Sequence, residues 1–177
     1  MTSPSRRSAL LLIAAVAAVS FAAGVQAQPI GPDRVGVRGD VLRPLQLDRA
    51  TLASFPAEDQ VTSSVVRRVD GQERQTSVRG VRLRAVIHRA GLAERDRLDW
   101  RKSVVIAVAS DGYRAVFSWP ELTNTDGGAQ VLLLYERDGA PLATDEGPFA
   151  LLAAADQRAG PRHVKWLASI EVRILRD

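Results

Sequence analysis

Short stretches of alternating hydrophobic and polar residues dominate the chain after residue 28, and they predict mainly strands. Residues 61–69 are rich in valine and end at Asp70-Gly71, a dipeptide typical of tight hairpin turns. The residues that follow form the return limb, which runs toward Val78. The pattern therefore predicts a β-hairpin with its turn at Asp70-Gly71.

Helical spacing of apolar residues is clearest between Val81 and Ala90. Gly91 follows directly and can adopt the left-handed conformation that ends many helices. His88 lies at the edge of the apolar stripe, where we expect it to pack or cap rather than to catalyse. The stripe places four residues on one face of the predicted helix: Leu83, Val86, Ile87 and Ala90.

The C-terminal half predicts a second hairpin and a long final strand. Val104–Ala109 is a continuous apolar run, a turn follows at residues 110–112, and Tyr113 and Phe117 alternate with polar residues beyond it. We expect Tyr113 to pack in the core beside Phe117; the alternative is that it lines the mouth of a cleft. Apolar residues of one parity predict a strand that buries one face: Val164, Trp166, Ala168, Ile170, Val172 and Ile174.

The remaining elements are short. Val35–Val41 is expected to form a strand, and Asp48 can cap a short helix within Leu45–Phe55 that ends at Pro56. Pro120 is expected to begin a helical turn, and Val131–Tyr135 a buried strand. Together these elements predict an α+β, mostly β fold, and the absence of repeats or linkers predicts a single domain over residues 28–177.

Residues 1–27 have the pattern of a cleaved signal peptide. Arg6 and Arg7 precede an apolar run over Ala9–Ala23, and Val25-Gln26-Ala27 is a small-x-small cleavage site. An uncleaved membrane anchor is the alternative, but the run is shorter than the ~20 residues that a spanning helix needs. We expect a periplasmic or secreted protein that begins at Gln28 and has no transmembrane segment; whether export uses the Sec or the twin-arginine route stays open.

The amino-acid composition excludes several kinds of functional site. The chain contains no cysteine, which excludes disulfides, thiolate metal sites and cysteine nucleophiles. The formal net charge is +4, but part of it belongs to the signal peptide, and the remaining arginines alternate with acidic residues. We therefore expect no nucleic-acid partner. The sequence also lacks the short motifs of serine and zinc hydrolases.

An ordered set of short motifs resembles the sulfite-oxidase-like molybdopterin-binding domain family over nearly all of the chain after residue 28. The resemblance implies a single fold of mixed sheets and short helices. In the first half the motifs are Val35-x-Val37-x-Gly39-Asp40, Pro44-Leu45-x-Leu47, Gly80-Val81-x-Leu83 and Ala90-Gly91-Leu92. In the second half they are Asp111-Gly112-Tyr113, Glu121-Leu122, Pro141-Leu142, Gly147-Pro148 and Arg162-x-Val164-Lys165-Trp166-Leu167-x-x-Ile170.

The resemblance also indicates candidate site residues. The family buries a molybdenum pterin whose metal is ligated by a cysteine, but the corresponding stretch, Val65–Gly71, has none. Arg162 and Lys165 lie in the segment that in the family helps to hold the pterin and its phosphate. We therefore take Arg162, His163 and Lys165 as candidate contacts to an anion or pterin. Arg68, in the stretch that corresponds to the metal-ligand loop of the family, is a fourth candidate. The alternative is that these side chains are solvated, and no catalytic or metal-ligating residue is assigned.

Three hypotheses for function follow. The first is an exported binding or accessory module that is not an enzyme, has no cofactor and works without molybdenum chemistry. The second is a molybdopterin-dependent oxidoreductase domain. The third is a periplasmic domain that senses a small organic anion. The partners expected are a periplasmic or membrane protein and a small anionic ligand.

Overall fold

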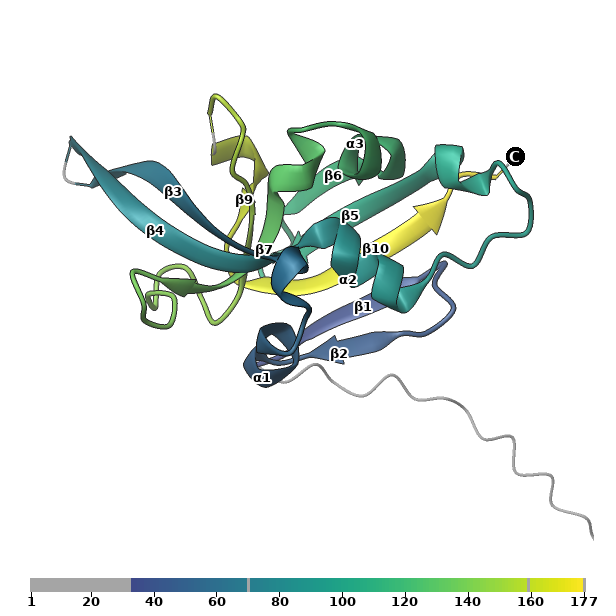
Figure 1. Cartoon of the computed structure of the whole chain (residues 1–177), viewed down its shortest axis with the longest axis horizontal. Helices are drawn as coiled ribbons and strands as arrows, with labels where there is room; N and C mark the ends of the chain where they lie inside the picture. The colour runs from purple at the N-terminus through teal and green to yellow at the C-terminus, as the bar shows by residue number, and fades with distance from the viewer. Residues whose placement is uncertain (1–32, 70, 159, 177) are drawn as a thin grey trace, which may run out of the picture.

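The computed structural model describes residues 33–69, 71–158 and 160–176, with the backbone alone at residues 67–69. Figure 1 shows two β-sheets with short helices packed beside them. This arrangement confirms the prediction of an α+β, mostly β fold. The signal peptide expected over residues 1–27 lies outside the described residues.

The first sheet brings the two ends of the described chain together. Its β1 pairs in parallel with β10, with Val37 opposite Ile170, whereas the other neighbours are antiparallel. In spatial order the sheet contains β2 (Leu45–Leu47), β1 (Val35–Gly39), β10 (Leu167–Ile174), β5 (Ser103–Ala109) and β6 (Arg114–Ser118). The predicted β5–β6 hairpin is confirmed.

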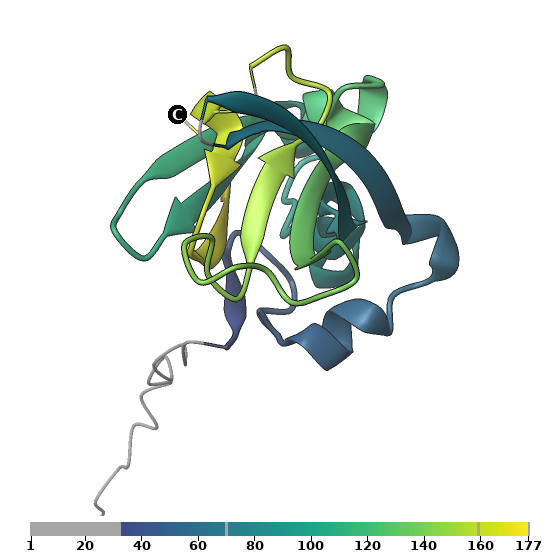
Figure 2. The ribbon, with the colours of Figure 1, turned by 90° about the vertical axis from the view of Figure 1, so that its left-hand side faces the viewer.

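The second sheet is antiparallel throughout, and its first hairpin extends away from the body of the molecule (Figures 1 and 2). This is the hairpin predicted across Asp70-Gly71. In spatial order the sheet contains β3 (Gln60–Val69), β4 (Gln72–Arg82), β7 (Val131–Arg137), β8 (Ala150–Ala153) and β9 (His163–Val164). The sequence pattern does not predict β8, because a four-residue apolar run is compatible with a helix or a strand.

The helices are short, and their ends match the capping residues in the sequence. The Asp48 side chain accepts a hydrogen bond from the Thr51 backbone at 2.8 Å and begins α1, while Gly91 ends α2 at a φ of 71°. None of the described helices is long and apolar enough to cross a membrane. The helices are α1 (Arg49–Ala53), α2 (Leu83–Ala90) and α3 (Trp119–Asn124), with 3₁₀ turns η1 (Ala57–Asp59), η2 (Asp99–Lys102), η3 (Gly128–Gln130) and η4 (Gly160–Arg162).

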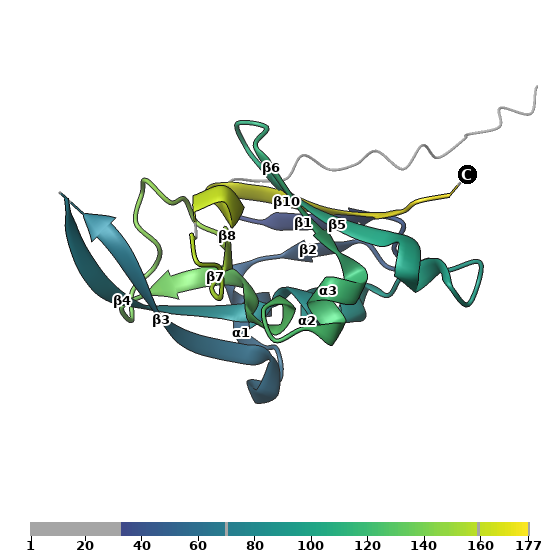
Figure 3. The ribbon, with the colours of Figure 1, turned by 90° about the horizontal axis from the view of Figure 1, so that it is seen from above.

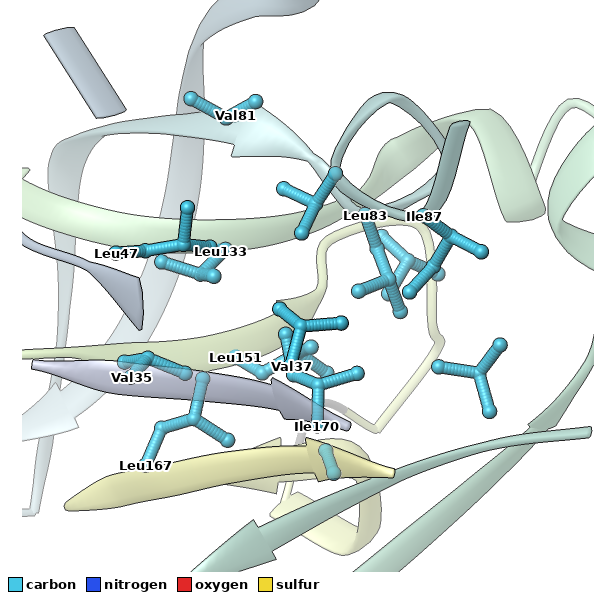
Figure 4. Packing of buried hydrophobic residues seen from close by; sticks show 14 of the residues in the cluster. Val35, Val37, Leu47, Val81, Leu83, Ile87, Leu133, Leu151, Leu167 and Ile170 are labelled. Carbon is cyan, nitrogen blue, oxygen red and sulfur yellow. The ribbon is translucent and has the colours of Figure 1, made fainter. Parts of the chain in front are cut away.

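The main hydrophobic core lies between the two sheets and the inner face of α2. Seen from above in Figure 3, α2 and α3 lie beside the body of the two sheets, and the β3–β4 hairpin projects from one end. Figure 4 shows side chains of both sheets meeting those of α2. The helix therefore buries the face that its spacing predicts. The labelled core residues are Val35, Val37, Leu47, Val81, Leu83, Ile87, Leu133, Leu151, Leu167 and Ile170.

The prediction of one long C-terminal strand is wrong at Trp166. The backbone of Trp166 is left-handed, with a φ of 49°, so the chain bends between β9 and β10. The alternation of buried and exposed residues is interrupted at this bend. Leu167 is buried instead of Trp166, which is 44% exposed. Val164, Ile170 and Val172 are buried as expected.

Candidate functional site

A pocket of about 490 Å³ lies where the β5–β6 turn of the first sheet meets β9 of the second. The bend between β9 and β10 forms part of its wall, so the chain crosses from one sheet to the other at the pocket. The lining residues come from four separate segments: Ala109, Ser110, Asp111 and Tyr113; Asp145; Gly160; and His163, Lys165 and Trp166.

The bend is fixed by backbone contacts on both sides. The Trp166 N–H donates to the Glu146 carbonyl at 2.8 Å, and the Trp166 carbonyl accepts from Ser110 N–H at 3.0 Å. Gly147 has a φ of 82°, and a Cβ added there would lie only 2.7 Å from Cδ2 of Trp166. A glycine is therefore required beside the indole, and the loop before β8 sets the position of the ring.

The second aromatic ring of the pocket belongs to Tyr113. This residue is 45% exposed, so the expectation that it packs in the core is wrong. The physical reason is its place just before β6, where its hydroxyl donates to the Pro161 carbonyl at 2.6 Å. Tyr113 and Trp166 thus present two half-exposed rings to the pocket.

A buried ionic network lies next to the pocket. Glu146 is fully buried and receives two hydrogen bonds from the Arg137 guanidinium, at 2.7 and 3.0 Å. Arg137 also donates to the Thr76 hydroxyl at 2.7 Å. Nε2 of His163 lies 2.8 Å from a Glu146 oxygen, and since an ionised carboxylate only accepts, this nitrogen carries the proton. The network therefore ties β4, β7 and β9 together.

The network keeps Glu146 ionised. Burial raises the pKa of this carboxyl, but the hydrogen bonds from His163 and Arg137 outweigh burial and lower the pKa to about 2. The sequence pattern did not mark Glu146 and Arg137 as site residues. The only signal was the Asp145-Glu146 pair before Gly147-Pro148, a pattern that a surface loop also shows.

Among the described residues that line the pocket, Lys165 is the one lysine or arginine. Its ammonium lies 3.0 Å from a carboxylate oxygen of Asp145, and both side chains are substantially exposed. An exposed ion pair of this kind contributes roughly 0–1 kcal/mol, so a ligand anion can compete for the ammonium. His163 differs, because its Nε2 is committed to the buried Glu146.

Of the four candidate residues, His163 and Lys165 line the pocket, and Arg162 does not. The Arg162 guanidinium is held by both oxygens of Asp156, at 2.5 and 2.7 Å, and by Glu121 at 2.6 Å. These hydrogen bonds raise the pKa of Arg162 above its ordinary value, and those to Asp156 have a larger effect than the one to Glu121. Arg162 is therefore held by two carboxylates next to the pocket and does not line it.

The fourth candidate, Arg68, has a side chain that lies outside the described residues. Its backbone belongs to β3 and pairs with Glu73 in the projecting hairpin. Among the described residues that line the pocket, none comes from the stretch 65–71.

The described residues do not fit a phosphorylated molybdenum pterin. This sequence has no cysteine to supply a thiolate, which is the ligand expected from the resemblance. Lys165 and His163 already have carboxylate partners, and Asp111 adds a further acid to the wall. In the described ranges, no group of three or more histidine and acidic residues could hold a metal ion. The described part of the pocket presents two aromatic rings and one ammonium.

Known proteins share this architecture. The solved structure of the sulfane dehydrogenase SoxCD from Paracoccus pantotrophus matches with a TM-score of 0.60 at 18% identity. The match covers 80% of this chain but only 38% of that chain, and at this identity the likeness shows the fold alone. No curated protein matches this sequence significantly. A family model described as "Oxidoreductase molybdopterin binding domain" matches residues 26–174. The chain therefore belongs to the family of oxidoreductase molybdopterin-binding domains.

Proposed function

We propose that this chain is an exported binding module of its family that recognises a small organic anion without molybdenum chemistry. The observation that carries the proposal is the pocket at the β9–β10 bend, where Tyr113, Trp166 and Lys165 meet in a chain without any thiolate. Export is supported by the signal-peptide pattern of residues 1–27.

The pocket chemistry indicates the class of ligand. The exposed indole and phenol rings offer flat apolar faces, on which a planar group can stack. One ammonium, weakly paired with Asp145, suits a single carboxylate better than a phosphate dianion. A ligand with a ring and one carboxylate matches both features.

The test of metal-free function uses protein exported from a host that makes the molybdenum cofactor. We expect N-terminal sequencing to begin at Gln28, elemental analysis to find far less than one molybdenum per chain, and sulfite oxidation to be absent. One molybdenum per chain together with sulfite turnover would instead establish the oxidoreductase hypothesis.

The same protein tests ligand recognition by titration with benzoate, followed by tryptophan fluorescence. Lys165→Met should weaken benzoate binding about tenfold, because it removes the ammonium that pairs with the carboxylate. Lys102→Met, which changes the other lysine of the chain on η2, is the matched control and should leave the affinity unchanged. Equal affinity for benzoate and benzylamine would refute anion recognition at this pocket.

A further inference from the structure

A second pocket, of about 520 Å³, lies between α2 and the connection from α1 to η1. It shares no lining residue with the pocket at the β9–β10 bend. In Figure 1 this connection rises from α1 to η1, next to α2. The lining residues are Ser54, Phe55, Pro56 and Asp59 from the connection and η1, and Arg84, Ala85, His88 and Arg89 from α2.

The spacing of Arg84, His88 and Arg89 along α2 places all three beside this pocket. Arg84 and His88 are four residues apart, as are Ala85 and Arg89, so the two pairs form adjacent rows on one side of α2. The His88 ring meets the Trp119 ring edge-on, with centroids 5.0 Å apart. The row of Arg84 and His88 thus continues from α2 toward α3.

The charges of this pocket differ from those of the first. Within the described ranges, neither Arg84 nor Arg89 forms an ion pair with a carboxylate within 4 Å. Asp59 is the one acidic residue among the lining residues, so the two guanidiniums leave an excess of positive charge. In the first pocket, by contrast, Lys165 and His163 each have a carboxylate partner.

The floor of the second pocket is apolar. Phe55 and Ala85 are buried, and Pro56 lies beside Phe55. The Arg89 guanidinium carbon lies 4.7 Å from the centroid of the Phe55 ring, a cation–π contact that holds this charge at the edge of the apolar floor. The pocket therefore combines an apolar floor with a cationic rim.

We propose that this second pocket binds an organic monocarboxylate with an apolar body. The apolar body would cover Phe55, Pro56 and Ala85, and the carboxylate would pair with Arg84 and Arg89. A guanidinium suits this role because its planar set of N–H donors matches the two oxygens of a carboxylate. The site is independent of the proposed function, because it uses none of the residues of the first pocket.

The experiment is a calorimetric titration of the mature chain with octanoate at low salt. Octanoate should bind, octylammonium should not, and acetate should bind much more weakly because it lacks the apolar body. Arg84→Met combined with Arg89→Met should weaken octanoate binding at least tenfold. Added salt should weaken octanoate binding to the unchanged protein, since the rim is exposed to solvent.

Two control variants test whether octanoate binds at this pocket. Arg101→Met removes an arginine that also lies over an aromatic ring, that of Trp100, but outside the pocket, and it should leave octanoate affinity unchanged. Octanoate binding that depends on Arg84 and Arg89 should persist in Lys165→Met, so that failure of this site and failure of the first pocket are distinguishable. Unchanged octanoate affinity in the double arginine variant, or loss of the arginine-dependent binding in Lys165→Met, would overturn the proposal. Thermal unfolding of each variant checks that it folds.

Discussion

Replacement of Glu146 by glutamine is expected to lower the free energy of unfolding by about 3–5 kcal/mol, because it leaves the charge of Arg137 buried without its counter-ion. Glutamine keeps the size of the side chain and can still accept a hydrogen bond. The loss of stability therefore measures the effect of removing the negative charge. Urea unfolding at neutral pH measures the effect.

The same network predicts how stability depends on pH. The pKa of Glu146 is about 2 in the folded protein and lies near its ordinary value of 4.5 when unfolded. A lowered folded-state pKa means that the stabilisation is complete above about pH 4.5 and is lost as the pH falls toward 2. The contribution is about 3 kcal/mol. Urea unfolding over this range should therefore show stability falling in the wild type and changing less in the Glu146→Gln variant.

Glu136→Gln provides the matched control. Glu136 is also a glutamate of the second sheet, but its partners, Arg49 and Arg79, lie on the surface at 3.3 and 4.0 Å. An exposed pair contributes roughly 0–1 kcal/mol, so this change should have little effect. Equal losses in the two variants would show that the buried network has no special role in stability.

Gly147→Ala is expected to destabilise the protein by about 2–5 kcal/mol and to alter the pocket. The left-handed backbone costs an alanine roughly 1–2 kcal/mol, and crowding against neighbours adds about 1–3 kcal/mol. The added Cβ would lie 2.7 Å from Cδ2 and 2.9 Å from Cα of Trp166, so rotating the indole away cannot relieve the clash. Benzoate binding should weaken along with stability, as measured by titration and urea unfolding.

Gly139→Ala separates the cost of the left-handed backbone from the cost of crowding. Gly139 has a φ of 77°, close to the 82° of Gly147, but a Cβ there would meet nothing within 4 Å. This variant should show only the backbone cost, about 1–2 kcal/mol, and unchanged benzoate binding. A loss as large as that of Gly147→Ala would contradict crowding by Trp166 as the cause.

Sequence alone was sufficient for the elements whose signals are local. Helix α2 follows from the spacing of its apolar residues and from Gly91, and α1 begins at Asp48 because its side chain caps the helix. The β3–β4 hairpin follows from a valine-rich first strand and the turn dipeptide after it. In each case the residues that decide the structure are near neighbours in the chain, so the pattern carries the information. The ordered motifs also identified the family, and the sequence showed the absence of a thiolate.

The tertiary structure decided the features that depend on distant partners. Trp166 follows the alternation of a buried strand, but its backbone contacts with Glu146 and Ser110 bend the chain and leave the indole half-exposed. Arg162 and Lys165 are both cations of one segment, yet Asp156 and Glu121 hold the first away from the pocket. Local patterns report which residues can be buried or charged. Which carboxylate each charge meets depends on how the two sheets join, so only the assembled fold determined the pocket.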